Sequence, residues 1–243
     1  MVQNELHACD TDRSAWRFVD LKHENVRTEL FEKVQTTQGV VERLVAINGM
    51  PLDAQQRAAE DARLQKLAND PDEQRRRLKE QLEDAGKARR MFEMLPTAFL
   101  YEFNPATKDS QVVRVTFKPN PQFQPPTREA EVFHHMTGEL LINTQQLRLR
   151  RIAGTLLDDV KFGWGVLGHL DKGGTFTVEQ EEVGTGHWDV VALDVSMRGK
   201  IVFFKSLNVQ QHEAMSHFEH VPESLSVADA TRLLGTSNVV AAK

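Results

Sequence analysis

Alternation of apolar and polar side chains predicts that most of this chain is β-strand. The alternation is clearest in two runs, Val113, Val115 and Phe117, and Val191, Leu193, Val195 and Met197. Side chains at every second position share one face of a strand, so this period is typical of an antiparallel sheet with one buried face. In the C-terminal half we expect strands over 137–143, 147–162, 174–183, 187–198 and 200–211.

A change of phase near Arg150 and Arg151 predicts a β-bulge. Leu149 occupies an odd-numbered position, whereas Ile152 and Leu156 occupy even-numbered positions. An extra residue bends a strand and increases its twist, and long bent strands curl a sheet into a half-barrel or barrel. The predicted fold class is therefore α+β, with a curved antiparallel sheet that forms a half-barrel or open barrel.

The first half of the chain adds two or three strands and a charged helical hairpin. Strands are expected within 16–47, and Asn48-Gly49 ends them in a tight turn because both residues tolerate a positive φ. Residues 53–95 then contain ten basic and ten acidic residues. Asp53 is the expected cap of a first helix, and Asp70-Pro71 starts a second. Because its apolar stripe is narrow, this hairpin is expected to lie over a surface as a lid or flank.

A short helix is expected near the C-terminus. Four prolines within 119–126 first predict an extended loop that is exposed or docked across a sheet edge. Ser226, three residues before Asp229, then forms a capping box that starts the helix. We expect one antiparallel-sheet domain over 1–222, which includes the charged hairpin, followed by a C-terminal helix and tail over 223–243.

Composition excludes several classes of partner and site. The chain has 243 residues, of which 40% are hydrophobic and 27% charged, as is typical of globular proteins. Its net charge of −5 provides no basic surface for nucleic acid or anionic lipid. No apolar run is long enough for a transmembrane helix. Cys9 is the single cysteine, which excludes an internal disulfide and a cysteine zinc cluster. We expect no metal and no cofactor.

Motifs for catalysis or metal binding are weak. His212, His217 and His220 follow spacings of five and three, which match no zinc signature, so a solvated polar segment is the simpler interpretation. The carboxylates of Asp158-Asp159 would face opposite sides of a strand rather than cooperate as a glycosidase pair. The glycines within 163–174 lack the strand-to-helix turn of a phosphate site. We therefore expect no enzymatic activity.

Aromatic side chains are the residues best able to line an apolar cavity. Burial of each is worth about 1.5–3 kcal/mol, so core packing alone also explains their presence. A curled sheet nevertheless has a concave face, and helices that cover only part of it would leave room for a hydrocarbon tail. The candidate ligand-binding residues are Phe162, Trp164, Phe176 and Trp188.

Seven short stretches carry information beyond pattern and composition. They are 43–52 (RLVAINGMPL), 117–121 (FKPNP), 125–130 (PPTREA), 138–142 (GELLI), 158–163 (DDVKFG), 172–176 (KGGTF) and 203–205 (FFK). Together they resemble a family of uncharacterised exported proteins from Acidobacteria, over residues 16 to 222. The succession of strands with a helical pair is also similar to the Lol-type carriers of outer-membrane lipoproteins, in which a half-barrel holds acyl chains under a helical lid. The family resemblance implies export to the periplasm by a signal that is not part of this sequence, and it transfers no functional residue.

Two functions of different kinds remain open. The first is a non-enzymatic periplasmic binding or carrier protein that holds a lipid, a lipidated protein or another apolar ligand in the concave face of the sheet. The second is a cell-envelope interaction or sensor module in which the charged hairpin contacts a protein partner and the sheet is a scaffold. A hydrolase with a site assembled across strands is a third interpretation, which no motif supports.

Overall fold

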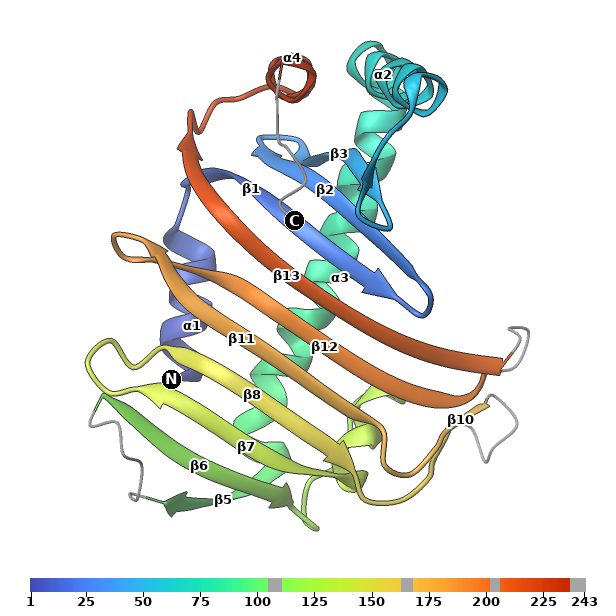
Figure 1. Ribbon diagram of the computed structural model, residues 1–243. Coiled ribbons are helices and arrows are strands. Elements are labelled where there is room, and N and C mark those ends of the chain that lie inside the picture. The colour runs from blue at the N-terminus through green and yellow to red at the C-terminus, as the bar shows by residue number, and fades with distance from the viewer. Residues whose placement is uncertain (105–110, 163–167, 202–205, 237–243) are drawn as a thin grey trace. The chain divides into compact units, whose positions relative to one another are not determined.

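The computed structural model describes residues 1–104, 111–162, 168–201 and 206–236 (Figure 1). The helices are α1 (Val2–Thr11), α2 (Ala54–Asn69), α3 (Pro71–Ala98) and α4 (Val227–Gly235), with a 3₁₀ helix η1 (Glu129–His135). The strands are β1 (Ala15–Glu24), β2 (Arg27–Thr36), β3 (Gly39–Ile47), β4 (Met50–Pro51), β5 (Phe99–Asn104), β6 (Val112–Pro119), β7 (Met136–Asn143), β8 (Leu149–Leu156), β9 (Val160–Phe162), β10 (Gly168–Leu170), β11 (Thr175–Gly184), β12 (His187–Ile201) and β13 (Ser206–Val221).

These strands form one open sheet of thirteen strands. Its order is β4-β3-β2-β1-β13-β12-β11-β8-β7-β6-β5, and β10 lies off this path, where it pairs with β12 and β9. The expected α+β class with an open antiparallel sheet is confirmed. The chain divides into two compact units. The first contains Met1–Thr11, Ala88–Glu182 and Trp188–His212, and the second contains Asp12–Lys87, Val183–His187 and Glu213–Lys243.

Apolar side chains on one face of β6, β7 and β8 hold the first unit together. Val115, Leu140 and Ile152 lie in one row across these strands, and all three are buried. Leu95 from α3 and Phe133 from η1 belong to the same core. Its buried members are Leu95, Ala98, Phe99, Val115, Phe117, Ala130, Phe133, Met136, Leu140, Leu149, Ile152, Leu156 and Val160. Helical side chains are thus packed directly against the apolar face of these strands.

A row of two glycines between two phenylalanines crosses the same face. Phe117 pairs with Gly138, Gly138 with Gly154, and Gly154 with Phe176. A Cβ added at Gly138 would lie 2.6 Å from the Phe117 ring, and one added at Gly154 would lie 2.4 Å from the Phe176 ring. Both rings therefore occupy the space above the glycines, an arrangement by which aromatic residues cover glycine in sheets.

The bulge predicted from the change of phase is confirmed at β8. Leu141 of β7 is opposite Arg151, whereas the next residue, Ile142, is opposite Leu149. Arg150 is therefore the extra residue on β8. Because a bulge exchanges the two faces of a strand beyond it, Leu149 and Ile152 both face the core although their parity differs.

In the second unit, one face of β1–β3 is packed against α2 and α4. Val34 of β2 lies opposite Val41 of β3, and both are buried. Leu64 of α2 and Leu234 of α4 join them in a second core. Hydrophobic burial therefore fixes both helices against the same three strands.

Two carboxylates are also buried on β1 and β2. Asp20 is fully buried, and its Oδ2 atom lies 2.7 Å from the Nζ atom of Lys33. Glu32 is 1% exposed and forms a salt bridge with Arg17. Asp20 and Glu32 lie on opposite faces, because Glu32 is opposite Val19, the residue that precedes Asp20 on β1. Each carboxylate depends on its partner, since an unpaired buried charge is strongly destabilising.

The predicted helix starts are confirmed. Asp53 accepts a hydrogen bond from the Gln56 backbone N–H at 2.8 Å, and the Gln56 side chain accepts one from the Asp53 backbone N–H at 3.0 Å. Ser226 and Asp229 form an equivalent capping box at α4. Asp70 accepts a backbone N–H from the first turn of α3 at 3.0 Å. Asn48 and Gly49 have φ values of 50° and 75°, as the predicted turn requires.

Some expected boundaries are wrong. The strand expected over 147–162 is two strands, β8 and β9, because the chain bends at Leu157 and Asp158. The strand expected over 200–211 is observed from Ser206 to Val221. The segment that contains His212, His217 and His220 is therefore part of β13. These three histidines are exposed, as expected for a solvated segment.

Two helices also differ from expectation. Helix α3 continues through Pro96 to Ala98, since one missing hydrogen bond is offset by burial of Leu95 and Ala98 in the core. Helix α1 was not predicted. Within the described ranges, none of the helices has an apolar stretch long enough to span a membrane.

Candidate functional site

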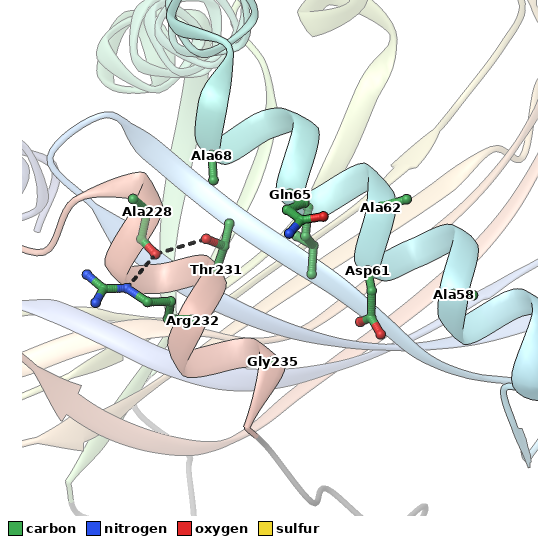
Figure 2. A pocket seen from close by; sticks show the side chains of 10 residues that line it. Ala58, Asp61, Ala62, Gln65, Ala68, Ala228, Thr231, Arg232 and Gly235 are labelled. Carbon is green, nitrogen blue, oxygen red and sulfur yellow. Dashed lines mark hydrogen bonds between the residues drawn. The ribbon is translucent and has the colours of Figure 1, made fainter.

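An open groove runs between α2 and α4 of the second unit (Figure 2). Its volume is about 540 Å³, within the range of ligand sites in proteins. It is lined by Ala58, Asp61, Ala62, Leu64, Gln65, Ala68, Ala228, Thr231, Arg232 and Gly235. A second hollow of about 430 Å³ at the α2–α3 turn shares Ala62 and Gln65 with it. The two hollows therefore share part of one wall, on α2.

Small side chains create the groove. Ala58, Ala62 and Ala68 come from α2, and Ala228 and Gly235 come from α4. None of these residues has a side chain beyond Cβ, so the helix backbones themselves form much of the walls. Leu64 is the buried apolar residue of the lining. A groove of this kind admits a chain that must approach a helix backbone closely.

Polar groups are distributed along both walls. Asp61 and Gln65 project from α2, and Thr231 and Arg232 project from α4 (Figure 2). The Thr231 hydroxyl and Arg232 Nε both donate hydrogen bonds to the carbonyl oxygen of Ala228, at 2.9 and 3.4 Å. The lining thus combines an acid, an amide, a hydroxyl and a base.

Arg43 of β3 ties the two walls together. Its guanidinium donates a hydrogen bond to Asp61 of α2 at 2.8 Å and another to the carbonyl oxygen of Leu234 in α4. The Arg43 side chain is only 12% exposed, whereas the Asp61 side chain is 57% exposed, so the bond to Asp61 is open to water. One side chain therefore sets the separation of α2 and α4.

Glu60 fixes α2 on the edge of β3. Its carboxylate is buried, accepts the Leu44 backbone N–H at 2.9 Å, and is bound by the Arg63 guanidinium. Burial alone would raise the pKa of Glu60, but the bonds from Arg63 and Leu44 outweigh burial and hold the pKa below its ordinary value. Arg63 also donates to the carbonyl oxygen of Glu42 at 2.6 Å. The wall formed by α2 is thus held in place by charge-assisted hydrogen bonds.

Helix α3 is attached to the start of β3 by a single amide. Gln81 Oε1 accepts the Val40 backbone N–H at 2.9 Å, and Gln81 Nε2 donates to the Val40 carbonyl oxygen at 3.3 Å. The amide therefore satisfies both backbone groups of Val40, as a neighbouring strand would. The charged hairpin is thereby fixed to the strands of the second unit at both of its helices.

Of the four predicted ligand-binding residues, only Phe176 and Trp188 have described side chains, and these two have different neighbours. Phe162 ends β9, but its side chain, like all of Trp164, lies outside the described structure. Phe176 packs against the first core, with its ring over Gly154. Trp188 donates a hydrogen bond from Nε1 to Gln146, and its ring lies 5.7 Å from the Arg148 guanidinium.

A cluster of Ser14, Asp12 and His187 contains the residue types of a hydrolase triad in another arrangement. Ser14 Oγ lies 3.2 Å from His187 Nδ1, and Asp12 pairs with the same nitrogen. In a triad the hydroxyl and the carboxylate bind different ring nitrogens. Burial raises the pKa of Asp12, but hydrogen bonds from Ser14 and His187 outweigh it and lower the pKa. The ring of His187 also stacks on Trp16, with centroids 4.7 Å apart.

The other candidate motifs have local partners. His212 pairs with Asp194 on the first unit. Asp158 accepts from His135 at 3.0 Å, and Asp159 accepts the Lys172 backbone N–H at 2.9 Å. Over the residues that the structure describes, no group of three histidine, cysteine or acidic side chains is arranged to hold a metal ion.

No family model matches this chain, and no curated protein matches it. The resemblances stated above therefore remain predictions. The groove was not predicted from the sequence, although one signal was present: alanines at 58, 62 and 68, the first two one helical turn apart, interrupt an otherwise charged segment. These alanines of α2 line a groove with α4 only because two distant segments meet: Ala58 and Ala228 are 170 residues apart in the sequence.

Proposed function

We propose that this protein is a non-enzymatic binding protein of the cell envelope, and that the groove between α2 and α4 receives a short segment of a partner polypeptide. The single observation that carries the proposal is the lining of the groove, which combines small side chains with polar groups on both walls. This is the interaction module considered from the sequence, with the contact placed on α2 of the charged hairpin.

The lining suits a polypeptide better than an acyl chain. Asp61, Gln65, Thr231 and Arg232 offer donors and acceptors that a peptide backbone can use. Asp61, Thr231 and Arg232 keep their partners within the protein, but an acyl chain would displace water from their remaining donor and acceptor sites without replacing it, which costs free energy.

The rigidity of the groove supports the same proposal. Arg43 spans both walls, and Glu60 anchors α2 to β3. A preformed site loses less conformational entropy on binding, and so gains more affinity per contact. The groove therefore does not depend on a partner to assemble its walls.

Carriage of a lipid, a lipidated protein or another apolar ligand is the second proposal. It requires space between the sheet and its helices. In the described part of the first unit, side chains of α3 and η1 pack against the apolar face, and Phe176 lies over Gly154. That packing favours the polypeptide proposal. Displacement of a fluorescent fatty acid by unlabelled fatty acid would support carriage, and absence of binding would contradict it. Periplasmic residence rests on the family resemblance and is tested by cell fractionation.

The polypeptide proposal is tested by selecting a random heptapeptide phage library on the full chain. Ala62→Trp fills the groove, whereas Ala59→Trp places the same side chain on an exposed position of α2 that lines neither hollow. We expect selected synthetic peptides to bind the wild type and A59W equally, and A62W about tenfold or more weakly. Thermal melts establish that both variants are folded. Equal binding by all three proteins, or no selected peptide, would contradict the proposal.

A further inference from the structure

The two strands at the ends of the sheet order are built differently. β4 has two residues, one of which is Pro51, and a helix cap follows within two residues. β5 has six residues, Phe-Leu-Tyr-Glu-Phe-Asn, and contains neither proline nor lysine. Short strands, proline and lysine are the usual means by which proteins prevent pairing at a sheet edge. β4 has such protection, whereas β5 has only the single charge of Glu102.

β5 also exposes large apolar side chains. Phe103 is 67% exposed, Leu100 is 46% exposed and Tyr101 is 41% exposed. Tyr101 and Phe103 are opposite Phe117 and Val115 in the β5–β6 register, so they lie on the same face as the core. Tyr101 and Phe103 thus expose apolar surface on one side of this strand edge, and Leu100 exposes it on the other.

The outer backbone edge of β5 is available as well. Ala98 accepts a backbone hydrogen bond from Asn120 at 3.0 Å, which sets the alternation of bonds toward β6. By this alternation Phe99, Tyr101 and Phe103 direct their backbone groups away from β6. Among the strands that the structure describes, none pairs with this edge (Figure 1).

We propose that β5 pairs with β5 of a second copy of this chain, antiparallel and around a two-fold axis. A two-fold axis perpendicular to the sheet places odd-numbered residues opposite odd-numbered ones and even-numbered residues opposite even-numbered ones. Each face of the sheet therefore continues into the same face of the second copy. Two registers keep most of β5 paired: one places Tyr101 opposite itself, and the other places Glu102 opposite itself. Directly opposed like charges are destabilising, which leaves the register centred on Tyr101.

The chosen register pairs aromatic side chains at both of its ends. Phe99 lies opposite Phe103 of the second copy, and Leu100 lies opposite Glu102 of the second copy. Phe99 already contacts the Phe117 ring at 4.6 Å between centroids. The exposed Phe103 therefore meets the margin of an existing aromatic cluster, where aromatic cross-strand pairs are favourable. Pairing of two β5 strands covers the free edge of both copies. A peptide unrelated to this chain would need a sequence complementary to β5 to do the same.

Sedimentation of the full chain over a range of concentrations tests the proposal. We expect a monomer–dimer equilibrium in which Phe103→Lys weakens dimerisation about tenfold or more. The matched control is Leu82→Lys, which replaces an apolar residue of similar exposure, 63%, on α3. L82K should dimerise as the wild type does. A monomer at every concentration, or equal dimerisation of F103K and wild type, would overturn the proposal.

Thiol crosslinking tests the register in a Cys9→Ser background. In an antiparallel hydrogen-bonded pair, opposed Cα atoms are about 5.5 Å apart, within reach of a disulfide. Tyr101→Cys should therefore form a covalent dimer on mild oxidation. Glu102→Cys should not, because its two copies would lie about 8 Å apart, two residues along the strand. Crosslinking through E102C but not Y101C would contradict the proposed interface. Circular dichroism confirms that both variants are folded.

Discussion

Substitution of Gly154 by alanine tests the packing that distinguishes a filled core from a ligand cavity. The added Cβ would lie 2.4 and 3.0 Å from two atoms of the Phe176 ring and 3.1 Å from Met136 Sδ. The ring must move, and overpacking of this kind costs about 1–3 kcal/mol. Alanine regains about 0.5–1 kcal/mol because glycine is unfavourable within a strand. We therefore expect a net loss of about 1–2 kcal/mol in the free energy of unfolding.

Urea denaturation with linear extrapolation measures this loss, and the slope should stay unchanged. In a Phe176→Ala background the obstructing ring is absent, so the same change at Gly154 should be neutral or stabilising. A double-mutant cycle should then give a coupling free energy of about 2 kcal/mol between the two sites. If G154A stabilises the protein with Phe176 present, the ring does not lie over Gly154, and the argument that this face is packed is wrong.

Two further predictions concern single side chains. Tyr101 is the sole tyrosine, and burial of its hydroxyl, which donates to the Leu95 carbonyl oxygen at 2.6 Å, raises its pKa to about 12. Absorbance near 295 nm should therefore titrate with a midpoint near 12. The free energy of unfolding should fall as pH rises from about 10 toward 12, because the tyrosine of the unfolded chain loses its proton at the lower pH. A midpoint near 10 in folded protein would refute the assignment. Lys33→Met leaves fully buried Asp20 without its cation and should lower the free energy of unfolding, measured by urea denaturation, by about 3–5 kcal/mol. The double variant K33M/D20N should recover most of this loss. A loss below about 1 kcal/mol in K33M would show that Asp20 does not depend on Lys33.

Local signals in the sequence predicted local structure. The turn at Asn48-Gly49, the caps at Asp53 and Ser226, and the bulge at Arg150 are each decided within a few residues. The α+β class followed from strand periodicity and the charged helical segment. These features do not depend on which segments meet in space, so one sequence was enough to predict them.

Features that depend on distant contacts were not predicted. Helix α1 is held by Glu5, whose buried carboxylate binds Arg148 and the Leu149 backbone N–H, more than 140 residues away. The groove requires α2 and α4 to meet on the same strands. Whether Phe176 lines a cavity or fills a core depends on a glycine in the neighbouring strand. Periodicity contains no information on any of these pairings.

The central claim is that the groove between α2 and α4 binds a polypeptide, and alanine methyl spectra test it most directly. With ¹³C-methyl alanine in the full chain, a selected peptide should shift the resonances of Ala58, Ala62, Ala68 and Ala228 as it saturates the site. Ala153, which lies on β8 of the first unit, should not move. Saturable shifts confined to the four groove alanines are the predicted result. Peptide binding that leaves these four methyl groups unshifted would contradict the account.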